Sequence, residues 1–192
     1  MTQTLEDMRL VVTGAASGIG RAIALEAANR GARRLVATDV NGDGLADLSA
    51  ALPPAAEVIC VAANLADAES AEKIAERART AFGGIDGLVN AAGITTRASF
   101  LDGTAETFDS VFAINTRAPF LLMQQAIRDM RSRAQAGVVV NIQSMNAHCV
   151  TLDISIYSAS NGALQSLTKN AANALFDDGI LFGSNDGRLY AL

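Results

Sequence analysis

The sequence has few of the residue types that mark disulfide-stapled or metal-bound proteins. Its 192 residues include two cysteines, one histidine, three prolines and no tryptophan. Cys60 and Cys149 form no close-spaced pair, which argues against a disulfide framework or a redox motif. The single histidine, His148, offers no set of metal ligands. We therefore expect a reduced, cytoplasmic protein without a metal site.

Long apolar runs and basic clusters are also scarce. No apolar stretch approaches the roughly 20 residues that cross a membrane, and residues 1–8 lack the apolar core of a signal peptide. The formal net charge is −5, and the basic clusters are Arg33-Arg34 and the arginines between Arg128 and Arg133, which we expect to be solvated. This acidic balance argues against nucleic acid or an anionic membrane as a partner.

Short apolar runs alternate with helical patterns along the whole chain, which predicts an α/β fold with a parallel sheet covered on both faces. The length suits a single domain, 1–192. We expect turns at residues 41–44, 53–54 and 83–84, and Pro119 should kink a long helix or lie near its boundary. The predicted strands are 9–13, 34–38, 57–62, 87–90 and 137–143, and the predicted helices are 18–29, 44–51, 68–82, 105–131 and 155–176.

The most informative local feature is a glycine-rich turn between the first strand and the first helix, Thr13-Gly14-Ala15-Ala16-Ser17-Gly18-Ile19-Gly20. Such a turn brings backbone N–H groups and a helix dipole against a pyrophosphate. Taken alone, it could equally be a structural turn. Asp39, however, ends the next apolar run, 19 residues after Gly20, near where a dinucleotide fold places the carboxylate that holds the adenosine ribose. The pair favours a nicotinamide dinucleotide site.

The spacing Gly-x-x-x-Gly-x-Gly resembles the glycine motif of the short-chain dehydrogenase/reductase family, and four later motifs are similar to that family in the same order. They are Asn90-Ala91-Ala92-Gly93 after a strand, Asn115 in a helix, Ser144 at a strand end and Tyr157 13 residues later. The resemblance implies a three-layer α/β/α Rossmann-type doubly wound sheet. It also implies hydride transfer between a nicotinamide cofactor and a small secondary alcohol or ketone.

The resemblance assigns catalysis to Asn115, Ser144 and Tyr157. Tyr157 would exchange a proton with the substrate oxygen, Ser144 would hydrogen-bond the same oxygen, and Asn115 would hold a helix bend and a water chain. Asp39 favours NAD over NADP, because its carboxylate would repel a 2′-phosphate. The expected cofactor-binding residues are Gly14, Ser17, Gly18, Ile19, Gly20, Asp39, Asn64, Leu65, Asn90, Ala91, Gly93, Tyr157 and Asn161.

One departure from the family lies in the catalytic helix. In the family, a lysine four residues after the tyrosine binds the nicotinamide ribose and lowers the pKa of the tyrosine; here that position holds Asn161. Asparagine keeps hydrogen-bonding groups but supplies no positive charge. Lys169 lies two helical turns further on, about 12 Å by helical rise, and is a poor substitute. We expect catalysis to be slow and favoured by alkali.

A second departure follows Ile180, where the chain lacks the family's usual C-terminal elements and residues 181–192 form an atypical tail. The apolar run Val138-Val139-Val140 predicts a strand covered on both faces, which would aggregate if left as a bare edge. We expect either 180–182 or 189–192 to pair beside 137–143. The nicotinamide end of the cleft should be unusually open.

Three functional interpretations stay open. The chain is an NAD-dependent alcohol dehydrogenase or carbonyl reductase weakened by Asn161, a catalytically silent NAD-binding protein that acts through partners, or a truncated product whose end has no selected function. The helices 105–131 and 155–176 are candidate surfaces for a homo-oligomer. His148 and Cys149 are interpreted as pocket wall or loop packing.

Overall fold

A largely parallel sheet forms the middle layer of the protein. In the computed structural model, which describes residues 5–184 and 189–190, seven strands follow the order β3-β2-β1-β4-β5-β6-β7. Strands β1 to β6 pair in parallel, and β7 pairs antiparallel with β6. The strands are β1 (Arg9–Thr13), β2 (Arg34–Asp39), β3 (Glu57–Ala62), β4 (Gly87–Asn90), β5 (Gly137–Asn141), β6 (Ile180–Ser184) and β7 (Leu189–Tyr190). The order reverses at β1 and β4, so the predicted doubly wound fold is confirmed.

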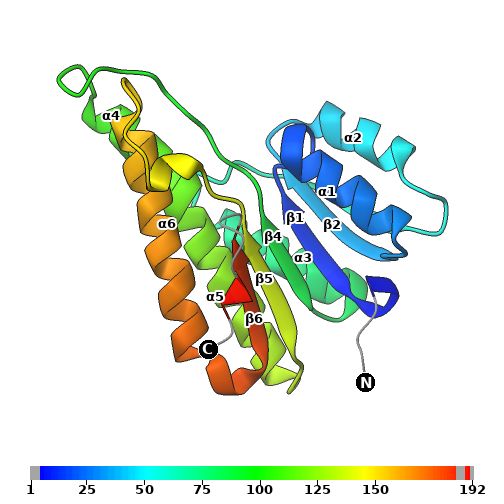
Figure 1. Cartoon of the computed structure of the whole chain (residues 1–192). Coiled ribbons are helices and arrows are strands. Elements are labelled where there is room, and N and C mark those ends of the chain that lie inside the picture. The colour runs from blue at the N-terminus through cyan, green and yellow to red at the C-terminus, as the bar shows by residue number, and fades with distance from the viewer. Residues whose placement is uncertain (1–4, 185–188, 191–192) are drawn as a thin grey trace.

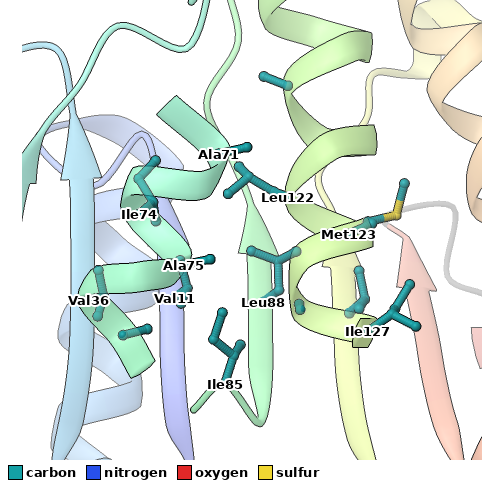
Figure 2. Packing of buried hydrophobic residues seen from close by; sticks show 14 of the residues in the cluster. Val11, Val36, Ala71, Ile74, Ala75, Ile85, Leu88, Leu122, Met123 and Ile127 are labelled. Atoms are coloured by element: carbon teal, nitrogen blue, oxygen red, sulfur yellow. The ribbon is translucent and has the colours of Figure 1, made fainter. Parts of the chain in front are cut away.

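Helices cover both faces of the sheet (Figure 1). They are α1 (Gly18–Asn29), α2 (Gly42–Ala51), α3 (Ser70–Phe82), α4 (Ala105–Phe112), α5 (Ala118–Ser132) and α6 (Ser155–Ala174), with short 3-10 turns at Leu5–Asp7, Met145–Ala147 and Phe176–Asp178. Neighbouring residues of β1 face opposite layers. Val12 packs with α1 and α2, whereas Val11 packs with α3 and α5, where Figure 2 shows Ala75 beside Val11 and Leu122 near Leu88.

The long helix predicted at 105–131 is interrupted. Between α4 and α5 the segment Ala113–Arg117 is a π-helix, in which Ala118 donates its backbone N–H to the carbonyl of Ala113. Pro119 lies in the first turn of α5 and has no N–H to donate to the carbonyl four residues earlier. The predicted boundary effect of Pro119 is confirmed, and the interruption brings Asn115 into the site described below.

The turn predicted at 41–44 is wrong in part, because these residues begin a helix. Asn41 is the N-cap of α2, and its side-chain oxygen accepts a hydrogen bond from the backbone N–H of Gly44 at 3.0 Å. Asparagine and glycine are typical both of turns and of helix starts, so the pattern alone did not separate the two. The predicted strand 137–143 ends earlier, at Asn141, and the helix 155–176 ends at Ala174.

The expectation that residues 180–182 pair beside the strand 137–143 is confirmed. Ile180 lies opposite Gly137 and Phe182 opposite Val139, and the side chain of Phe182 is fully buried. The second run pairs with β6 through Leu189 and Tyr190, while residues 191–192 lie outside the described residues. The predicted double coverage of β5 is wrong in part, because Val139 is buried but Val138 and Val140 are only half-buried.

An ion-pair network lies at the end of the sheet where the parallel strands β1 and β4 begin. The carboxylate of Asp86, at 0% exposure, accepts from Arg9 Nε at 2.6 Å and from Arg133 Nη1 at 3.0 Å. Arg133 also pairs with Asp129 at 2.7 Å, and Asp129 accepts the backbone N–H of Ile85 at 2.8 Å. Arg133 is therefore not the solvated arginine expected from the sequence. Burying the pairs together avoids leaving an isolated charge in the interior.

Candidate functional site

Two adjoining cavities lie where the parallel strands end, at the edge where ligands of open α/β sheets bind. We call the first, of about 380 Å³, the glycine cavity; it is lined by Gly14, Ser17, Gly18, Ile19, Gly20, Asp39, Val40, Ala63, Asn64, Leu65, Ala91, Ala92, Gly93, Ile94 and Ile114. We call the second, of about 470 Å³, the tyrosine cavity; it is lined by Ile19, Ala91, Ala92, Gly93, Ile94, Thr95, Asn115, Ile142, Gln143, Ser144, Met145, Tyr157, Asn161 and Leu164. Five residues belong to both, so the two form one continuous cleft.

The glycine turn is shaped by the space that side chains would need. Gly14 and Gly18 have φ values of +67° and +54°, which glycine adopts readily. A Cβ atom at Gly20 would lie 2.2 Å from the carbonyl oxygen of Gly14, so a larger residue cannot fit there without moving the backbone. A Cβ atom at Gly18 would meet no described atom within 4 Å. The turn is thus tight inside and open toward the cavity, a backbone cradle that fits a diphosphate at the N-terminus of α1.

Asp39 connects the end of β2 to the glycine turn. Its two carboxylate oxygens accept hydrogen bonds from the backbone N–H groups of Ala16 at 3.1 Å and Asn41 at 3.0 Å. Each oxygen keeps a further lone pair, and the carboxylate lines the glycine cavity beside Asn64 and Leu65. The Asn64 side chain accepts from the backbone N–H of Ala66 at 3.0 Å, which leaves its amide N–H₂ group for a ligand.

Ser144 and Tyr157 line the same cavity from two different elements. Ser144 follows β5 and precedes the turn Met145–Ala147, and its Oγ accepts from the backbone N–H of Asn146 at 3.2 Å. Its own hydroxyl proton is therefore available. Tyr157 lies in the first turn of α6, and its hydroxyl bonds to no other residue that the structure describes. Both hydroxyls can donate to one ligand oxygen.

Asn161 is tied to both of these residues through its side-chain amide. Its Oδ1 accepts from the backbone N–H of Ser144 at 2.9 Å, and its Nδ2 donates to the backbone carbonyl of Tyr157 at 2.9 Å. The residue is only 6% exposed. The amide thus joins the loop after β5 to the first turns of α6, a bridging contact that sequence reasoning missed.

Asn115 makes a similar bridge from the π-helical segment. Its Oδ1 accepts from the backbone N–H of Ile94, and its Nδ2 donates to the carbonyl of Ile94, both at 2.9 Å. Nδ2 also lies 3.1 Å from Ser160 Oγ on α6. The predicted role in holding the helix bend agrees with this position, since the amide connects the bend to the segment after β4 and to α6.

Asn90 does not line either cavity, although the resemblance placed it among the cofactor-binding residues. It is 2% exposed, and its Nδ2 donates to Asn141 Oδ1 at 2.8 Å. Asn141 in turn donates to Thr168 Oγ1 at 2.8 Å. This buried polar chain joins β4, β5 and α6 beneath the cleft. Sequence reasoning missed Asn141 and Thr168, because a pattern does not show which way a polar side chain faces.

Several cavity residues have no polar chemistry to flag them in a sequence. Ile94 and Met145 follow the ends of β4 and β5, and Leu164 lies two helical turns after Tyr157 on the same face of α6. The sequence signal that could have identified them is their position, just after a strand end or on the helix face of Tyr157. His148 lies outside both cavity linings and packs on α6, with its Nε2 2.7 Å from Gln165 Nε2. Cys149 is exposed and lines neither cavity.

Metal chemistry and membrane spanning find no support in the part of the chain that the structure describes. Residues 5–184 and 189–190 contain no group of three or more histidine, cysteine, aspartate or glutamate side chains that could hold a metal ion. None of the described helices combines the length and apolar character needed to cross a bilayer.

Outside the cleft, burial raises the pKa of the Cys60 thiol, which makes it a weaker nucleophile at neutral pH.

Comparisons with known proteins agree with this geometry. A family model described as short chain dehydrogenase matches residues 9–184. The chain is 38% identical over 175 residues to carbonyl reductase (NADPH) 2 of Sus scrofa, covering 91% of this chain and 68% of the relative. It is 36% identical over 180 residues to an L-rhamnose 1-dehydrogenase (NAD(P)(+)) of Azotobacter vinelandii, covering 92% and 70%.

The solved structures that resemble this fold include proteins of the same family. A short-chain type dehydrogenase/reductase from Mycobacterium marinum superimposes with a TM-score of 0.89 at 27% identity, covering 94% of this chain and 74% of that chain. The family match spans the glycine turn, Asp39 and every residue of the tyrosine cavity.

Proposed function

This chain belongs to the short-chain dehydrogenase family, and on that premise we propose that it is an NAD-dependent oxidoreductase acting on a small secondary alcohol or ketone. The observation that carries the proposal is that Ser144 and Tyr157 line one cavity continuous with the glycine cradle. Members of the family bind a nicotinamide cofactor. The names of two relatives point to NADPH or to either cofactor, so the preference for NAD is argued from this chain's own residues.

The residues of the glycine cavity would hold the adenosine and diphosphate part of the cofactor. Backbone N–H groups at the start of α1 favour the diphosphate charge, and the carboxylate of Asp39 suits ribose hydroxyls. A 2′-phosphate near Asp39 would bring two negative charges together, which supports NAD over NADP. When bound, the nicotinamide supplies or accepts the hydride.

The residues of the tyrosine cavity would handle the proton. In the reducing direction, the Tyr157 hydroxyl donates its proton to the substrate oxygen while the Ser144 hydroxyl donates a hydrogen bond to the same oxygen. In the oxidising direction, deprotonated Tyr157 accepts the alcohol proton. Asn161 keeps Ser144 and α6 together through the bond to the Ser144 backbone. It supplies no positive charge to favour deprotonated Tyr157, so we propose slow oxidation at neutral pH.

A catalytically silent NAD-binding protein is the second candidate, and the surroundings of Tyr157 favour it. No cationic side chain belongs to the described lining of the tyrosine cavity. Both ends of the Asn161 amide are already bonded within the protein. Cofactor binding without turnover would then be the outcome.

Oxidation of NADH in the presence of a panel of ketones tests the proposal. We expect measurable turnover that Tyr157→Phe lowers by at least about 100-fold, because the variant loses the proton donor, as general acid–base catalysis contributes typically about 10²–10⁴-fold. The affinity for NADH, measured by fluorescence titration, should fall by no more than about tenfold in the variant, because Tyr157 is one of many expected cofactor contacts. Turnover that is equal in wild type and variant would contradict the role of Tyr157, and NADH binding without any turnover would favour the silent protein.

A further inference from the structure

We propose that the tyrosine cavity selects an uncharged ketone or secondary alcohol that carries an apolar substituent, over carboxylate-bearing or polyhydroxylated substrates. This selectivity rests on the proposed function, which leaves the substrate class open. It follows from three features of the cavity and its mouth: the charge of the lining, the hydrogen bonds already made there, and the exposed side chains around it.

The lining provides no partner for a charged substrate. None of the described residues that line the tyrosine cavity carries a charge. The charged residues of the loop 91–104 and of the segment 148–154, among them Arg97 and Asp153, do not belong to the lining. Moving a carboxylate from water into such a cavity removes its hydration without providing an opposite charge. A keto acid or a phosphorylated sugar would therefore bind poorly.

The polar side chains of the lining are mostly occupied by the protein itself. The Asn115 amide is bonded to both backbone groups of Ile94, and the Asn161 amide to Ser144 and Tyr157. Gln143 Nε2 donates to Thr168 Oγ1 at 3.2 Å.

Three hydroxyls of the lining, those of Thr95, Ser144 and Tyr157, keep donor capacity for a ligand. Ser144 and Tyr157 are committed to the reacting oxygen. Thr95 alone is then left for any further hydroxyl, so a substrate with four or five hydroxyls would lose most of its hydrogen bonds to water.

The mouth of the cavity is apolar. Met145 belongs to the lining and is 73% exposed. The loop 91–104 contributes its first residues, Ala91 to Thr95, to the lining, and further along it the backbone N–H of Ala98 donates to the carbonyl of Asp153 in the segment 148–154 at 2.9 Å. Figure 1 shows both segments at the same end of the sheet, near α4 and the start of α6. The exposed apolar side chains of these two loops are Phe100 (84%), Leu101 (91%), Val150 (99%) and Leu152 (82%).

Met145 is an exposed apolar side chain of the lining itself, and the two segments that carry the other four are joined by the hydrogen bond between Ala98 and Asp153. An alkyl or aryl group attached to the reacting carbonyl would remove this surface from water, which favours binding roughly in proportion to the area covered. The single polar atom of such a substrate matches the two hydroxyls of Ser144 and Tyr157. The cavity therefore fits a ligand with one polar end and one apolar end.

Equilibrium binding of three ketones to the NAD⁺-loaded protein tests the inference, since NAD⁺ cannot reduce them. The compounds are acetophenone, 4-acetylbenzoate and a ketopentose, measured by ligand-observed NMR titration. We expect acetophenone to bind at least about tenfold more tightly than either of the others. Met145→Lys should lower the affinity for acetophenone at least about fivefold and raise the affinity for 4-acetylbenzoate. Met145→Leu should preserve the order of the three affinities.

Tighter binding of the ketopentose or of 4-acetylbenzoate would overturn the inference, as would binding of none of the three. The proposed function is judged separately, by binding of the dinucleotide and oxidation of NADH. If the dinucleotide does not bind, the same ranking measured on the free protein still decides the selectivity. A Met145→Lys variant that leaves the affinities for acetophenone and 4-acetylbenzoate both unchanged would contradict the apolar contact at the mouth and overturn the inference.

Discussion

Asn161 uses one side-chain amide for two neighbours, the backbone N–H of Ser144 and the backbone carbonyl of Tyr157. A lysine at this position could not replace the first contact, because an ammonium group donates hydrogen bonds but has no acceptor for the Ser144 N–H. Compared with the lysine that the family resemblance implies at this position, Asn161 lacks a positive charge and adds a connection between the loop after β5 and α6. Asn161 therefore positions Ser144 and the start of α6 but does not stabilise deprotonated Tyr157 by charge.

Asn161→Lys should raise the rate of alcohol oxidation near neutral pH by about 10- to 1000-fold. A nearby cation typically lowers the pKa of an acid by about 1–3 units, so more of Tyr157 would be deprotonated at a given pH. The same variant should lose about 1–3 kcal/mol of stability, because the part-buried N–H of Ser144 loses its acceptor. pH–rate profiles and urea unfolding give the two readouts.

Asn161→Met is the matched control, since it removes the amide without adding charge. It should lose stability like the lysine variant and show no gain in rate. Identical pH–rate profiles for wild type and the lysine variant would mean that position 161 does not control Tyr157.

Motif spacing predicted where the site residues stand at the ends of strands, but it did not predict which way their side chains face. Asp39 was expected at the end of β2 and lines the glycine cavity. Asn90 occupies the expected place in the chain, yet its amide faces Asn141 in the core. Both residues end a strand, where a side chain can turn toward the cleft or away from it. The neighbouring strand and helix decide between the two orientations, as Asn141 on β5 and Thr168 on α6 do for Asn90. The spacing of residues in one sequence does not show which neighbours will pack there.

Among the elements, the glycine turn has the least tolerance for change. Gly20→Ala should lower NADH affinity by at least about 100-fold, because a Cβ atom would lie 2.2 Å from the carbonyl oxygen of Gly14 and force the turn to open. Gly162→Ala on α6 is the matched control, since its Cβ atom would meet no described atom within 4 Å and the residue lines neither cavity. Fluorescence titration with NADH compares the two. Equal affinity in both variants would show that the tightness of the turn does not matter for binding.

Regular elements were predictable because their periodicity persists over many residues, and irregular ones were not. The predicted helix 18–29 matches α1, and the predicted strand 57–62 matches β3. The π-helix Ala113–Arg117 keeps the apolar spacing of a continuous helix, so only Pro119 indicated a break. The cap formed by Asn41 was read as a turn for a similar reason, since the same residue types serve both structures.

In the whole molecule, β6 extends the sheet beside β5, the strand that leads to Ser144. Phe182→Ala should lower the free energy of unfolding by about 3–5 kcal/mol, because the side chain is fully buried in the core under α6. Leu181→Ala is the control on the same strand, where the side chain is 41% exposed and the expected loss is about 1 kcal/mol. Urea unfolding followed by circular dichroism measures both. Similar losses in the two variants would mean that β6 is not packed as described.

We propose that the cleft binds a nicotinamide dinucleotide and prefers NADH, a claim that isothermal titration calorimetry can decide. Wild-type protein should bind NADH at least about tenfold more tightly than NADPH, because the carboxylate of Asp39 opposes a second negative charge. Asp39→Ala should narrow that preference to about threefold or less. Tighter binding of NADPH by the wild type would contradict the role of Asp39, and binding of neither dinucleotide would contradict the claim itself.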